Sequence, residues 1–480
     1  MPEFSLIKPE RVFSYFEEIC AIPRGSGDMA KISRYCVDFA EKQGLKYYTD
    51  SYGNVVIYKD GTLGYENSQP VILQGHLDMV CQKTEDCPID FTKDGLDVYV
   101  DGDYIKARGT TLGADNGIAV AMILAILESN DIAHPPIEAV FTVDEEIGLI
   151  GANVLDKSVL RSKRMINLDA EEDDTLTVSC AGGNDFTVKI PLERVVFFGD
   201  TITVSLEGLQ GGHSGVEIDK GRVNANNLMG RLLNHLEFDN EFKIVSVNGG
   251  DKGNAITNKC TAVLCCDNAD AFIAQIASYL DVIKIELSGR EPDFRYALEV
   301  EQGSEQFVID DEIAKGLIYF LSCVPEGVIR MSAEIAGLVE TSQNLGILKT
   351  EQNEITIQFA QRSNIKSGLV FLKEMMTRFS MCVPCETASS GYYPPWEFLR
   401  ESPLQELYKE CYEAYYGKKP KVEAIHAGLE CSVFSAAIEG LDCIAIGPEM
   451  HGVHTVNEKL SVSSTENTFR LLVSILKRMK

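Results

Sequence analysis

Short apolar segments alternate with helical segments along the first 185 residues, and this alternation limits the possible fold more than any other feature. Strands are predicted at NVVIY (54–58), VILQ (71–74), IEAVFTV (137–143) and RMINL (164–168). Helices are predicted at 9–22, from Met29 to Lys42 with Gly44 as the C-terminal stop, and at GIAVAMILAILES (117–129). Strands alternating with helices are typical of an α/β sheet.

The pattern changes from about residue 185 onward. Alternating strands are predicted at FTVKIPLE (186–193), TITVSLEG (201–208), CTAVLCC (260–266), EVEQG (299–303) and NEITIQFAQRS (353–363), with helices at 224–236 and 269–280 between them. After SSGYYPPWEF (389–398) the C-terminal segment is predicted to form a helix near 403–416, a strand at 443–447 and a helix near 465–479. The chain is therefore predicted to form one α/β domain from residues 1–185 and 389–480, with an α+β domain from residues 186–388 between them.

Charge and composition exclude several classes of function. The 480 residues contain 44 Lys and Arg against 72 Asp and Glu, a formal net charge of −28, which argues against binding to nucleic acid or anionic lipid. The N-terminus lacks a signal-peptide core, and no apolar run approaches the roughly 18 residues of a membrane span. The 14 scattered cysteines are expected to be reduced thiols. Cys382 and Cys385 form a single CxxC motif without a second pair, which is weak evidence for a zinc site. We expect a cytoplasmic protein.

Polar residues end the strand in VILQGHLDMV (71–80). His76 and Asp78 are two residues apart, so in an extended backbone their side chains point the same way. An imidazole beside a carboxylate suits a metal ligand and the group that orients it. The alternative is a strand-end histidine and an unrelated solvated aspartate.

Further polar residues lie mostly just after the ends of predicted strands, where open α/β sheets build their sites. They are Asp115 at the mouth of the apolar helix, Glu145 and Glu146 after IEAVFTV, Asp169 after RMINL, and His454 after CIAIG. Each has a simpler interpretation. Asp115 could be a helix N-cap, and the acidic residues Glu145, Glu146 and Asp169 could lie on a solvated surface. His451, three residues before His454, could be the ligand in its place.

Taken together, these residues form a chemically consistent set. Two histidines and three carboxylates could hold two divalent cations, with one carboxylate bridging, and nitrogen and oxygen ligands suit zinc. One acid of the Glu145–Glu146 pair could bind metal while the other stays free as a base. A water between the two cations would be acidified and could attack a carbonyl carbon, with the free glutamate moving its proton to the leaving amine.

These segments resemble the M20 metallopeptidase family. The resemblance rests on QGHLDMV, RGTTLGADNGIA, VDEEIGLIGA, NLDAEE and the tail HTVNE, and GGHSG, HAGLEC and YYPPW add to it. The motifs occur in the family's order from the first helix to the tail. They are most similar to the family's aminoacyl-histidine (Xaa-His) dipeptidase branch, also called non-specific cytosolic dipeptidase.

The resemblance implies a role for each matching residue of the metal site. One metal would be bound by His76, Asp115 and Asp169, and the other by Asp115, Glu146 and His454, with Asp78 orienting His76 and Glu145 as general acid/base. The Asp115–Asn116 peptide would be cis. His454 is preferred to His451 because Glu458 follows it by four residues, as in the family's HxxxE pattern. The metals would be two divalent ions, Zn²⁺ by family habit, with Mn²⁺ or Co²⁺ as alternatives.

The middle segment resembles the family's lid domain, which carries dimer contacts and part of the substrate site. His213 would reach the active site of the partner subunit and polarise the scissile carbonyl. Asn254 and Arg362 would contact substrate, with Arg362 pairing the C-terminal carboxylate. Gly428 would line the pocket, and His426 is open as a further lining residue. The simpler readings are an ordinary loop amide for Asn254 and a strand-edge ion pair for Arg362.

The expected fold is thus a mixed-sheet α/β zinc-peptidase catalytic domain, interrupted by an inserted α+β lid and dimerisation domain. The expected activity is metal-dependent hydrolysis of unblocked dipeptides, of the Xaa-His type with broad specificity. An N-acyl amino acid amidohydrolase or deacetylase would use the same metals. A non-catalytic binding protein on this fold would lack a ligand or the base, and none is missing. The partners expected are small peptides and a second copy in a homodimer, without nucleic acid or membrane.

Overall fold

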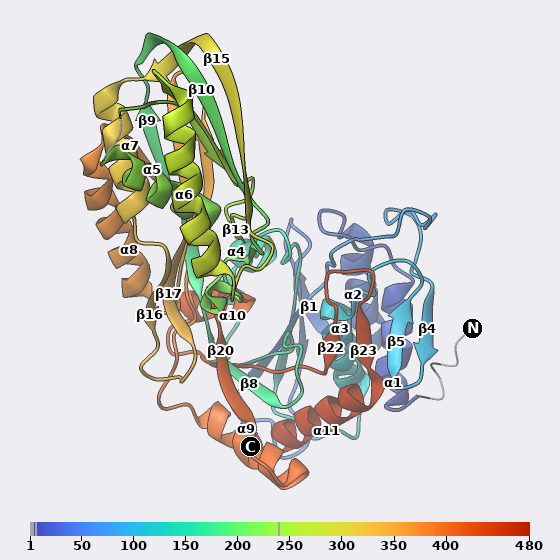
Figure 1. The fold of residues 1–480 in the computed structure, drawn as a ribbon. Helices are drawn as coiled ribbons and strands as arrows, with labels where there is room; N and C mark the ends of the chain where they lie inside the picture. Colours follow the sequence, from blue (N-terminus) through green and yellow to red (C-terminus); the bar gives the residue numbers. More distant parts are fainter. Residues whose placement is uncertain (1–3, 5–6, 239–240) are drawn as a thin grey trace. The chain divides into compact units, whose positions relative to one another are not determined.

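The computed structural model describes residue 4 and residues 7–238 and 241–480. The chain divides into two compact units, each with its own sheet and core (Figure 1). Unit 1 contains Met1–Cys180, Phe398–Ala424 and Leu429–Lys480, and unit 2 contains Ala181–Glu397 and Ile425–Gly428. The division into a catalytic domain of residues 1–185 and 389–480 with a lid domain of residues 186–388 between them stays a prediction.

Unit 1 is built on an eight-stranded mixed sheet whose central strands are parallel. The strand order is β1 (Lys46–Thr49), β2 (Val55–Lys59), β6 (Ile137–Thr142), β3 (Val71–His76), β7 (Arg164–Asn167), β21 (Asp442–Ala445), β8 (Thr175–Cys180) and β20 (Lys421–Ile425). Strand β3 lies parallel to both β6 and β7, and β21 is parallel to β7. The expected mixed α/β fold is therefore confirmed.

Helices and a smaller sheet complete unit 1. The helices are α1 (Glu10–Cys20), α2 (Ala30–Gln43), α3 (Ala114–Glu128), α4 (Ile150–Val154), α9 (Pro403–Tyr416), α10 (Glu430–Ala437) and α11 (Val462–Arg478). The smaller sheet has the order β22 (Met450–His451), β23 (Lys459–Ser461), β5 (Tyr104–Ala107) and β4 (Val98–Asp101). A short 3₁₀ helix spans Lys157–Val159.

The apolar runs of the sequence form the core of unit 1. Every residue of β3 and β6 is buried, as expected for central strands of a covered sheet. Helix α3 is buried on nearly all sides, which explains why its sequence is apolar throughout. Gly75 permits the close packing of α3 on β3, because a Cβ there would clash with Oδ1 of Asn116.

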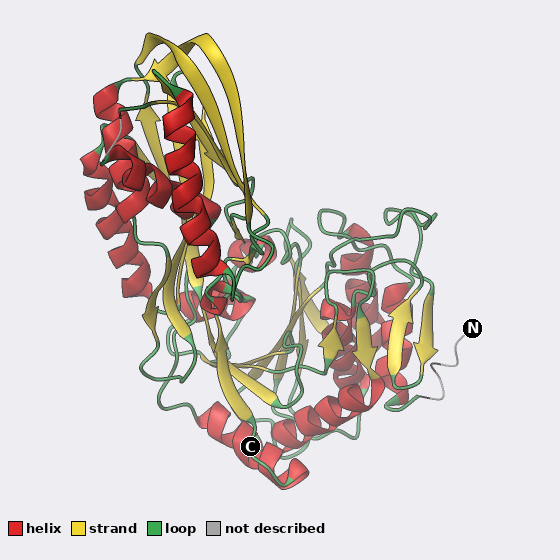
Figure 2. Cartoon of the chain, in the orientation of Figure 1, coloured by secondary structure: helices red, strands yellow, loops and turns green. Residues whose placement is uncertain are grey.

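Unit 2 is an antiparallel sheet covered by four described helices (Figure 2). The strand order is β15 (Arg295–Ile309), β10 (Arg194–Glu207), β14 (Cys260–Cys266), β12 (Lys243–Gly249), β17 (Val339–Thr350), β18 (Glu354–Ser363), β9 (Gly182–Pro191) and β19 (Glu386–Tyr393), and β16 (Gly327–Met331) pairs with β17. The helices are α5 (Ala225–Glu237), α6 (Ala269–Leu287), α7 (Asp311–Cys323) and α8 (Lys366–Phe379). A separate pair joins β11 (Gly212–His213) to β13 (Ala255–Ile256), and 3₁₀ helices span Ile218–Lys220 and Ser380–Cys382.

The apolar faces of these strands and helices pack into one core. Inward-facing residues such as Ile202, Val204 and Leu264 pack with Leu232 and Phe320 of the helices. Alternate residues of β10 and β14 are more exposed, so the period-two patterns of the sequence correspond to a sheet covered by helices on one face.

The described cysteines are all free thiols, and most of them are buried. Cys382 and Cys385 are partly accessible and form no disulfide, in line with the reduced state expected from the sequence. None of the helices described for this chain has the length and apolar character needed to cross a membrane.

Candidate active site

The ends of the parallel strands of unit 1 gather the polar residues singled out in the sequence. His76 is the last residue of β3, Glu145 and Glu146 follow β6, and Asp169 follows β7. Because β6, β3 and β7 are adjacent and parallel, these side chains emerge at the same edge of the sheet.

Asp115 lies between the two histidines and presents one carboxylate oxygen to each. Its Oδ1 is 3.0 Å from Nε2 of His76, and its Oδ2 is 3.0 Å from Nε2 of His454. Oδ1 of Asp169 is 3.5 Å from Nε2 of His76, and Oε1 of Glu146 is 2.9 Å from Nε2 of His454. The peptide bond between Asp115 and Asn116 is cis.

The donor set fits two metal ions that share Asp115. Ligand atoms of His76, Asp115 and Glu146 all lie within 4.8 Å of one another. This single group spans two sets of contacts, one of His76 with Asp115 and Asp169 and one of His454 with Asp115 and Glu146. Imidazole nitrogens with carboxylate oxygens are the donor chemistry of zinc and similar divalent ions. The carboxylates are mostly buried, with the Glu146 and Asp169 side chains 6% and 7% exposed. Buried carboxylates in such numbers need cations close by.

The imidazoles of His76 and His454 contribute positive charge beside these carboxylates. Hydrogen bonds to Asp115 and Glu146 raise the pKa of His454 to about 11. Burial favours a higher pKa for Asp115, but hydrogen bonds to His454 and His76 hold it well below its usual range. Burial raises the pKa of Asp169 to about 7. The site therefore contains more carboxylates than its histidines can compensate.

Asp78 connects His76 to the turn that carries the two glutamates. Nδ1 of His76 lies 3.1 Å from the backbone oxygen of Asp78 and 3.4 Å from its Oδ1. The Asp78 carboxylate also accepts hydrogen bonds from the backbone N–H groups of Glu145 at 3.0 Å and Glu146 at 3.3 Å, and from Oγ of Ser26 at 2.8 Å. It thus orients the imidazole and fixes the turn.

Glu145 is the carboxyl of the pair that His454 does not contact. Burial raises its pKa well above the usual range, and the nearby charges of Asp169 and Glu430 add to this effect against the opposing effect of His76. A carboxyl in this environment holds a proton more readily than one in water.

Glu458 has a role that the sequence analysis did not assign. Its carboxylate accepts hydrogen bonds from the four backbone N–H groups of residues 112–115, at distances of 2.7–3.4 Å. These groups open helix α3 and include the amide of Asp115. Glu458 therefore caps α3 from the far end of the chain, and only its spacing from His454 gave a signal in the sequence.

Two further residues that the sequence did not reveal hold the backbone around these ligands. The buried Arg24 donates from Nη1 to the backbone oxygens of Leu77 and Asp78, both at 3.1 Å, and from Nη2 to that of Gly113. Asn116 accepts from the backbone N–H of His76 at 3.2 Å and donates to the oxygen of Leu168 at 2.8 Å. Arg24 lies in none of the quoted motifs, and Asn116, although it lies in RGTTLGADNGIA, was assigned no such contact.

A buried polar network lies among strands β3, β6 and β7 and helix α10. Glu430 accepts hydrogen bonds from Oγ1 of Thr142 at 2.6 Å and from Nε2 of Gln74, and Gln74 accepts from Asn167 at 2.6 Å. Burial raises the pKa of Glu430 to about 7. The motif HAGLEC contains this residue, but the sequence analysis considered only His426 and Gly428 within it.

The structure separates the two tail histidines. His454 contacts Asp115 and Glu146, whereas Nε2 of His451 lies 2.8 Å from Oε1 of Glu449, and its ring lies 6.0 Å from that of Tyr104. His451 is therefore engaged elsewhere. His454 also has a positive φ of 64°, which is uncommon for a residue with a side chain.

The four residues expected to bind substrate all belong to unit 2. His213 in β11 pairs with Ala255 in β13, and the N–H of Ser214 donates to the backbone oxygen of Asn254 at 2.9 Å. Arg362, near the end of β18, donates to the hydroxyl of Tyr393 at 2.8 Å. Gly428 packs against the ring of Tyr393.

The hydrogen bonds of His213 define its tautomer. Nδ1 accepts from the backbone N–H groups of Gly215 and Val216, both at 3.2 Å, so the proton of the neutral ring belongs on Nε2. Burial and the charge of Arg362 lower the pKa of His213, which keeps the ring neutral. His213 can therefore donate one hydrogen bond from Nε2.

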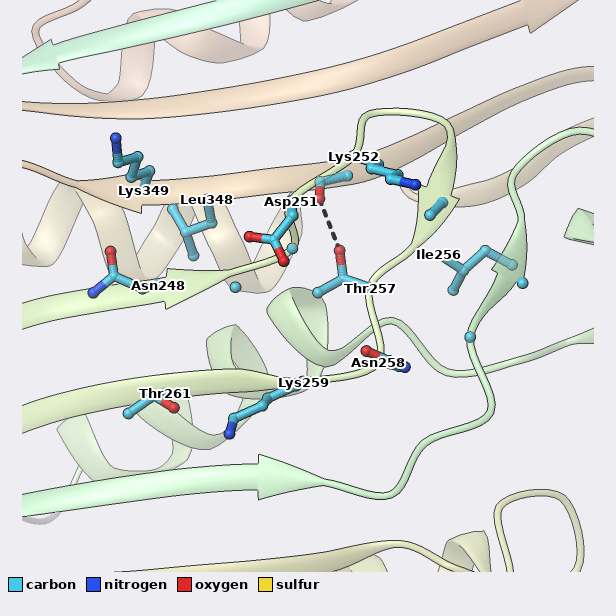
Figure 3. A pocket seen from close by; sticks show the side chains of 16 residues that line it. Asn248, Asp251, Lys252, Ile256, Thr257, Asn258, Lys259, Thr261, Leu348 and Lys349 are labelled. Carbon is cyan, nitrogen blue, oxygen red and sulfur yellow. Dashed lines mark hydrogen bonds between the residues drawn. The ribbon is translucent and has the colours of Figure 1, made fainter. Parts of the chain in front are cut away.

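A separate pocket of about 750 Å³ opens on unit 2 beside the loop that contains Asn254 (Figure 3). Its wall includes Asn248, Asp251, Lys252, Lys259 and Lys349, and Thr257 donates across it to the backbone oxygen of Gly346 at 3.0 Å. Lys259 pairs with Glu207 at 2.7 Å and Lys349 with Glu351 at 2.6 Å, so two of its three ammonium groups are already compensated. None of the four expected substrate residues lines it.

Comparisons with known proteins agree with this geometry. Residues 72–478 match the family described as Peptidase family M20/M25/M40. The cytosol non-specific dipeptidase of Escherichia coli strain K12 is 36% identical over 483 residues, which covers 100% of this chain and 99% of that protein.

Solved structures show the same relationship. The crystal structure of aminoacylhistidine dipeptidase from Vibrio alginolyticus has a TM-score of 0.91 and 35% identity, and it covers 99% of this chain and 98% of its own. Aminopeptidase PepT from Bacillus cereus shares the fold at a TM-score of 0.58 with 17% identity, covering 98% of this chain and 99% of its own.

Proposed function

This chain belongs to peptidase family M20/M25/M40, and on that premise we propose that it is a metal-dependent dipeptidase acting on unblocked dipeptides, of the Xaa-His type with broad specificity. The observation that carries the proposal is the position of Asp115, with one carboxylate oxygen facing each of two histidines. The two full-length relatives, both named as dipeptidases, favour this activity over hydrolysis of N-acyl amino acids.

The residues of unit 1 would hold two divalent ions. His76, Asp115 and Asp169 would bind one ion, and Asp115, Glu146 and His454 the other. When bound, the ions supply Lewis-acid polarisation and make a nearby water easier to deprotonate. We propose Zn²⁺, because the donors are imidazole nitrogens and carboxylate oxygens, with Mn²⁺ and Co²⁺ as alternatives that the same donors accept.

Glu145 would move the proton. Burial, with the charges of nearby acids, raises the pKa of its carboxyl, and its turn is fixed by the Asp78 carboxylate. It would accept the proton of the attacking water and then deliver it to the leaving amine. Asp78 would keep Nε2 of His76 directed at the cluster, because it contacts Nδ1 on the opposite side of the ring.

Unit 2 would supply the substrate contacts. His213 would reach the active site of the partner subunit and donate its Nε2–H to the carbonyl oxygen of the scissile bond there, which matches its tautomer. Arg362 would pair with the free C-terminal carboxylate, while Asn254 and the backbone at Gly428 would contact the rest of the peptide.

The first test is amine release by metal-reconstituted protein from alanyl-histidine and, in parallel, from N-acetyl amino acids. Chelator-treated protein is the control. We expect cleavage of the dipeptide that disappears with chelator and returns when zinc is added. Cleavage of N-acetyl amino acids alone would support the proposed metal site but contradict the proposed substrate class. Activity that resists metal removal would overturn the proposal.

We also propose a homodimer formed through unit 2, in the cytoplasm. The paired strands β10 and β15 form a ribbon in which β15 is an edge of the sheet. The proposal is supported by apolar side chains exposed on this ribbon, namely Val196 at 59%, Phe198 at 69% and Phe307 at 59%. Light scattering should give twice the chain mass for the wild type. Phe198→Ser with Phe307→Ser should give a monomer, whereas Phe238→Ser, which changes an exposed phenylalanine outside the ribbon, should remain dimeric.

A further inference from the structure

We propose that Tyr393 is a positioning residue for Arg362: its hydroxyl fixes the guanidinium so that one edge stays open for the C-terminal carboxylate of the substrate. This inference deepens the proposed function and rests on its assignment of Arg362 to that carboxylate. Tyr393 is the last residue of β19 and the second residue of the motif YYPPW, to which the sequence analysis assigned no role.

Two nitrogens of the Arg362 guanidinium differ in their hydrogen bonding. Nη1 donates to the Tyr393 hydroxyl at 2.8 Å. Nε is buried and has no hydrogen-bond partner among the described residues. A buried donor without a partner is costly, so a ligand that accepts from this edge gains the energy otherwise lost. A carboxylate does so with two oxygens, because the guanidinium presents its N–H groups in a planar fork.

Two glycines make room for the tyrosine ring. A Cβ at Gly183 would lie 2.8 Å from the Tyr393 hydroxyl oxygen and 2.9 Å from Cε1. A Cβ at Gly428 would lie 3.1 Å from Cε2 on the other edge of the ring. The ring therefore fits in a slot that only residues without side chains can form, and the slot sets the place of its hydroxyl.

The segment that carries Gly428 is itself anchored by a buried relay. Nε2 of His426 lies 2.7 Å from Oγ of Ser342, and its Nδ1 lies 3.1 Å from Oδ1 of Asn364. Nδ2 of Asn364 donates to the backbone oxygen of Ile425 at 3.2 Å, so the amide orientation makes Nδ1 of His426 the donor and Nε2 the acceptor. This relay holds residues 425–428 against β17 and β18.

Arg362 carries the positive charge in the group that it forms with His426 and His213. Burial, with the charge of Arg362, lowers the pKa of His426 to about 3, and the same two effects lower that of His213. Both rings are therefore neutral near pH 7. A carboxylate approaching the cluster meets one oriented guanidinium, and removing the tyrosine hydroxyl should weaken its binding without touching the metal ligands or Glu145.

The test measures binding, so it does not depend on turnover. In the Glu145→Gln background with zinc bound, calorimetry compares alanyl-histidine with its C-terminal amide. We expect the free dipeptide to bind more tightly than its amide. Tyr393→Phe should weaken the affinity for the free dipeptide by about fivefold to tenfold, which corresponds to the loss of one hydrogen bond. The affinity for the amide should change little. Tyr392→Phe is the matched control, because Tyr392 is the neighbouring residue and is 56% exposed.

A double-mutant cycle shows whether Tyr393 acts through Arg362. Tyr393→Phe should add little to the loss caused by Arg362→Lys, whereas independent roles would give additive losses. Gly428→Ala, which crowds the same ring, should resemble Tyr393→Phe in raising KM more than it lowers kcat. An unchanged preference for the carboxylate in Tyr393→Phe, or no such preference in the parent, would overturn the inference. Failure of the proposed activity would appear separately, as absence of chelator-sensitive hydrolysis by the wild type.

Discussion

Single carboxylates at this site differ in role according to what surrounds them. Oε1 of Glu146 lies 2.9 Å from Nε2 of His454, whereas burial, with the charges of nearby acids, raises the pKa of its neighbour Glu145. Asp78 accepts hydrogen bonds from the backbone of both glutamates. Adjacent residues of the same type can thus act as ligand and as base, because their contacts and burial differ.

Glu145→Gln should lower kcat by at least about a thousandfold, because the amide cannot accept a proton from water. Zinc content should stay near two per chain by elemental analysis, since the other acids remain. Glu146→Gln is the contrasting variant and should lose one zinc. Turnover by Glu145→Gln near the wild-type rate would remove Glu145 from the mechanism.

Glu458→Gln should lower the melting temperature and the affinity for one or both metals. The amide keeps one acceptor oxygen but turns an N–H₂ group toward the backbone N–H groups of residues 112–115, so several of their hydrogen bonds are lost. Loss of charge-assisted hydrogen bonds of this kind costs about 2–4 kcal/mol. Calorimetric melting with and without zinc measures both the melting temperature and its dependence on metal. Glu410→Gln is the control, because the Glu410 side chain is 64% exposed, and it should change neither the melting temperature nor the metal affinity.

At the level of elements, strongly patterned segments were predicted well and weakly patterned ones were not. The helix from Met29 to Lys42 appears as α2 and ends at Gly44, whose φ of 68° explains the stop. The apolar helix was predicted to begin at 117. Although α3 is bounded at Ala114, Asp115 and Asn116 have non-helical backbone angles, so its regular turns begin at the predicted residue. Helices α7 and α8 and the long strand β17 were missed, since β17 is buried yet contains polar residues such as Gln343 and Asn344.

Gly75→Ala should disturb the packing of α3 on β3. The added methyl group would clash with Oδ1 of Asn116 and lie 2.9 Å from Cβ of Ala119, so the helix must shift. We expect a loss of about 1–3 kcal/mol in the free energy of unfolding and weaker metal binding through His76. Gly289→Ala is the control, because a Cβ at Gly289 would have nothing within 4 Å, and it should be neutral or slightly stabilising.

Glu326, between α7 and β16, should make unit 2 less stable as pH rises. Burial raises its folded pKa to about 7 from an ordinary value of 4.5, so the folded state binds the proton more tightly. Its contribution is fully present below pH 4.5 and is lost as the pH rises toward 7. Glu326→Gln should therefore be more stable relative to wild type at pH 8 than at pH 5, by about 1–3 kcal/mol.

The only tryptophan provides the measurement for this prediction. Trp396 is 2% exposed within unit 2, so its fluorescence in urea reports the unfolding of that unit. The exposed Glu374→Gln serves as control, and equal pH dependence in wild type and Glu326→Gln would contradict the prediction.

Across the whole molecule, metal removal should act unequally on the two units. All five expected ligands belong to unit 1, so bound metal stabilises that unit by mass action. Chelator should lower the unfolding midpoint followed by far-ultraviolet circular dichroism more than the midpoint followed by Trp396. A shift of equal size in both signals would show that the two units unfold together.

The sequence predicted the mixed α/β fold, which is confirmed, and it identified candidate ligands that the structure brings together. Candidates such as His76 and Asp169 were accessible to sequence reasoning because each lies at or just after the end of an apolar strand. Arg24, Glu430 and Tyr393 were not, because their roles depend on contacts with residues distant in the chain. The metal, catalytic and substrate roles of the site residues stay predictions until the measurements above are made.

The separation of the ligands along the chain has a consequence for the timing of biosynthesis. His454 joins Asp115 across 339 residues, and the cap from Glu458 to Ala114 spans 344. At about 5–20 residues per second, a ribosome needs roughly 20–70 s to make the stretch between Asp115 and His454. Until then a nascent chain would lack His454 and the cap from Glu458, so the proposed metal site could not assemble. On the proposed function, hydrolysis would begin only after the last part of the chain has been made.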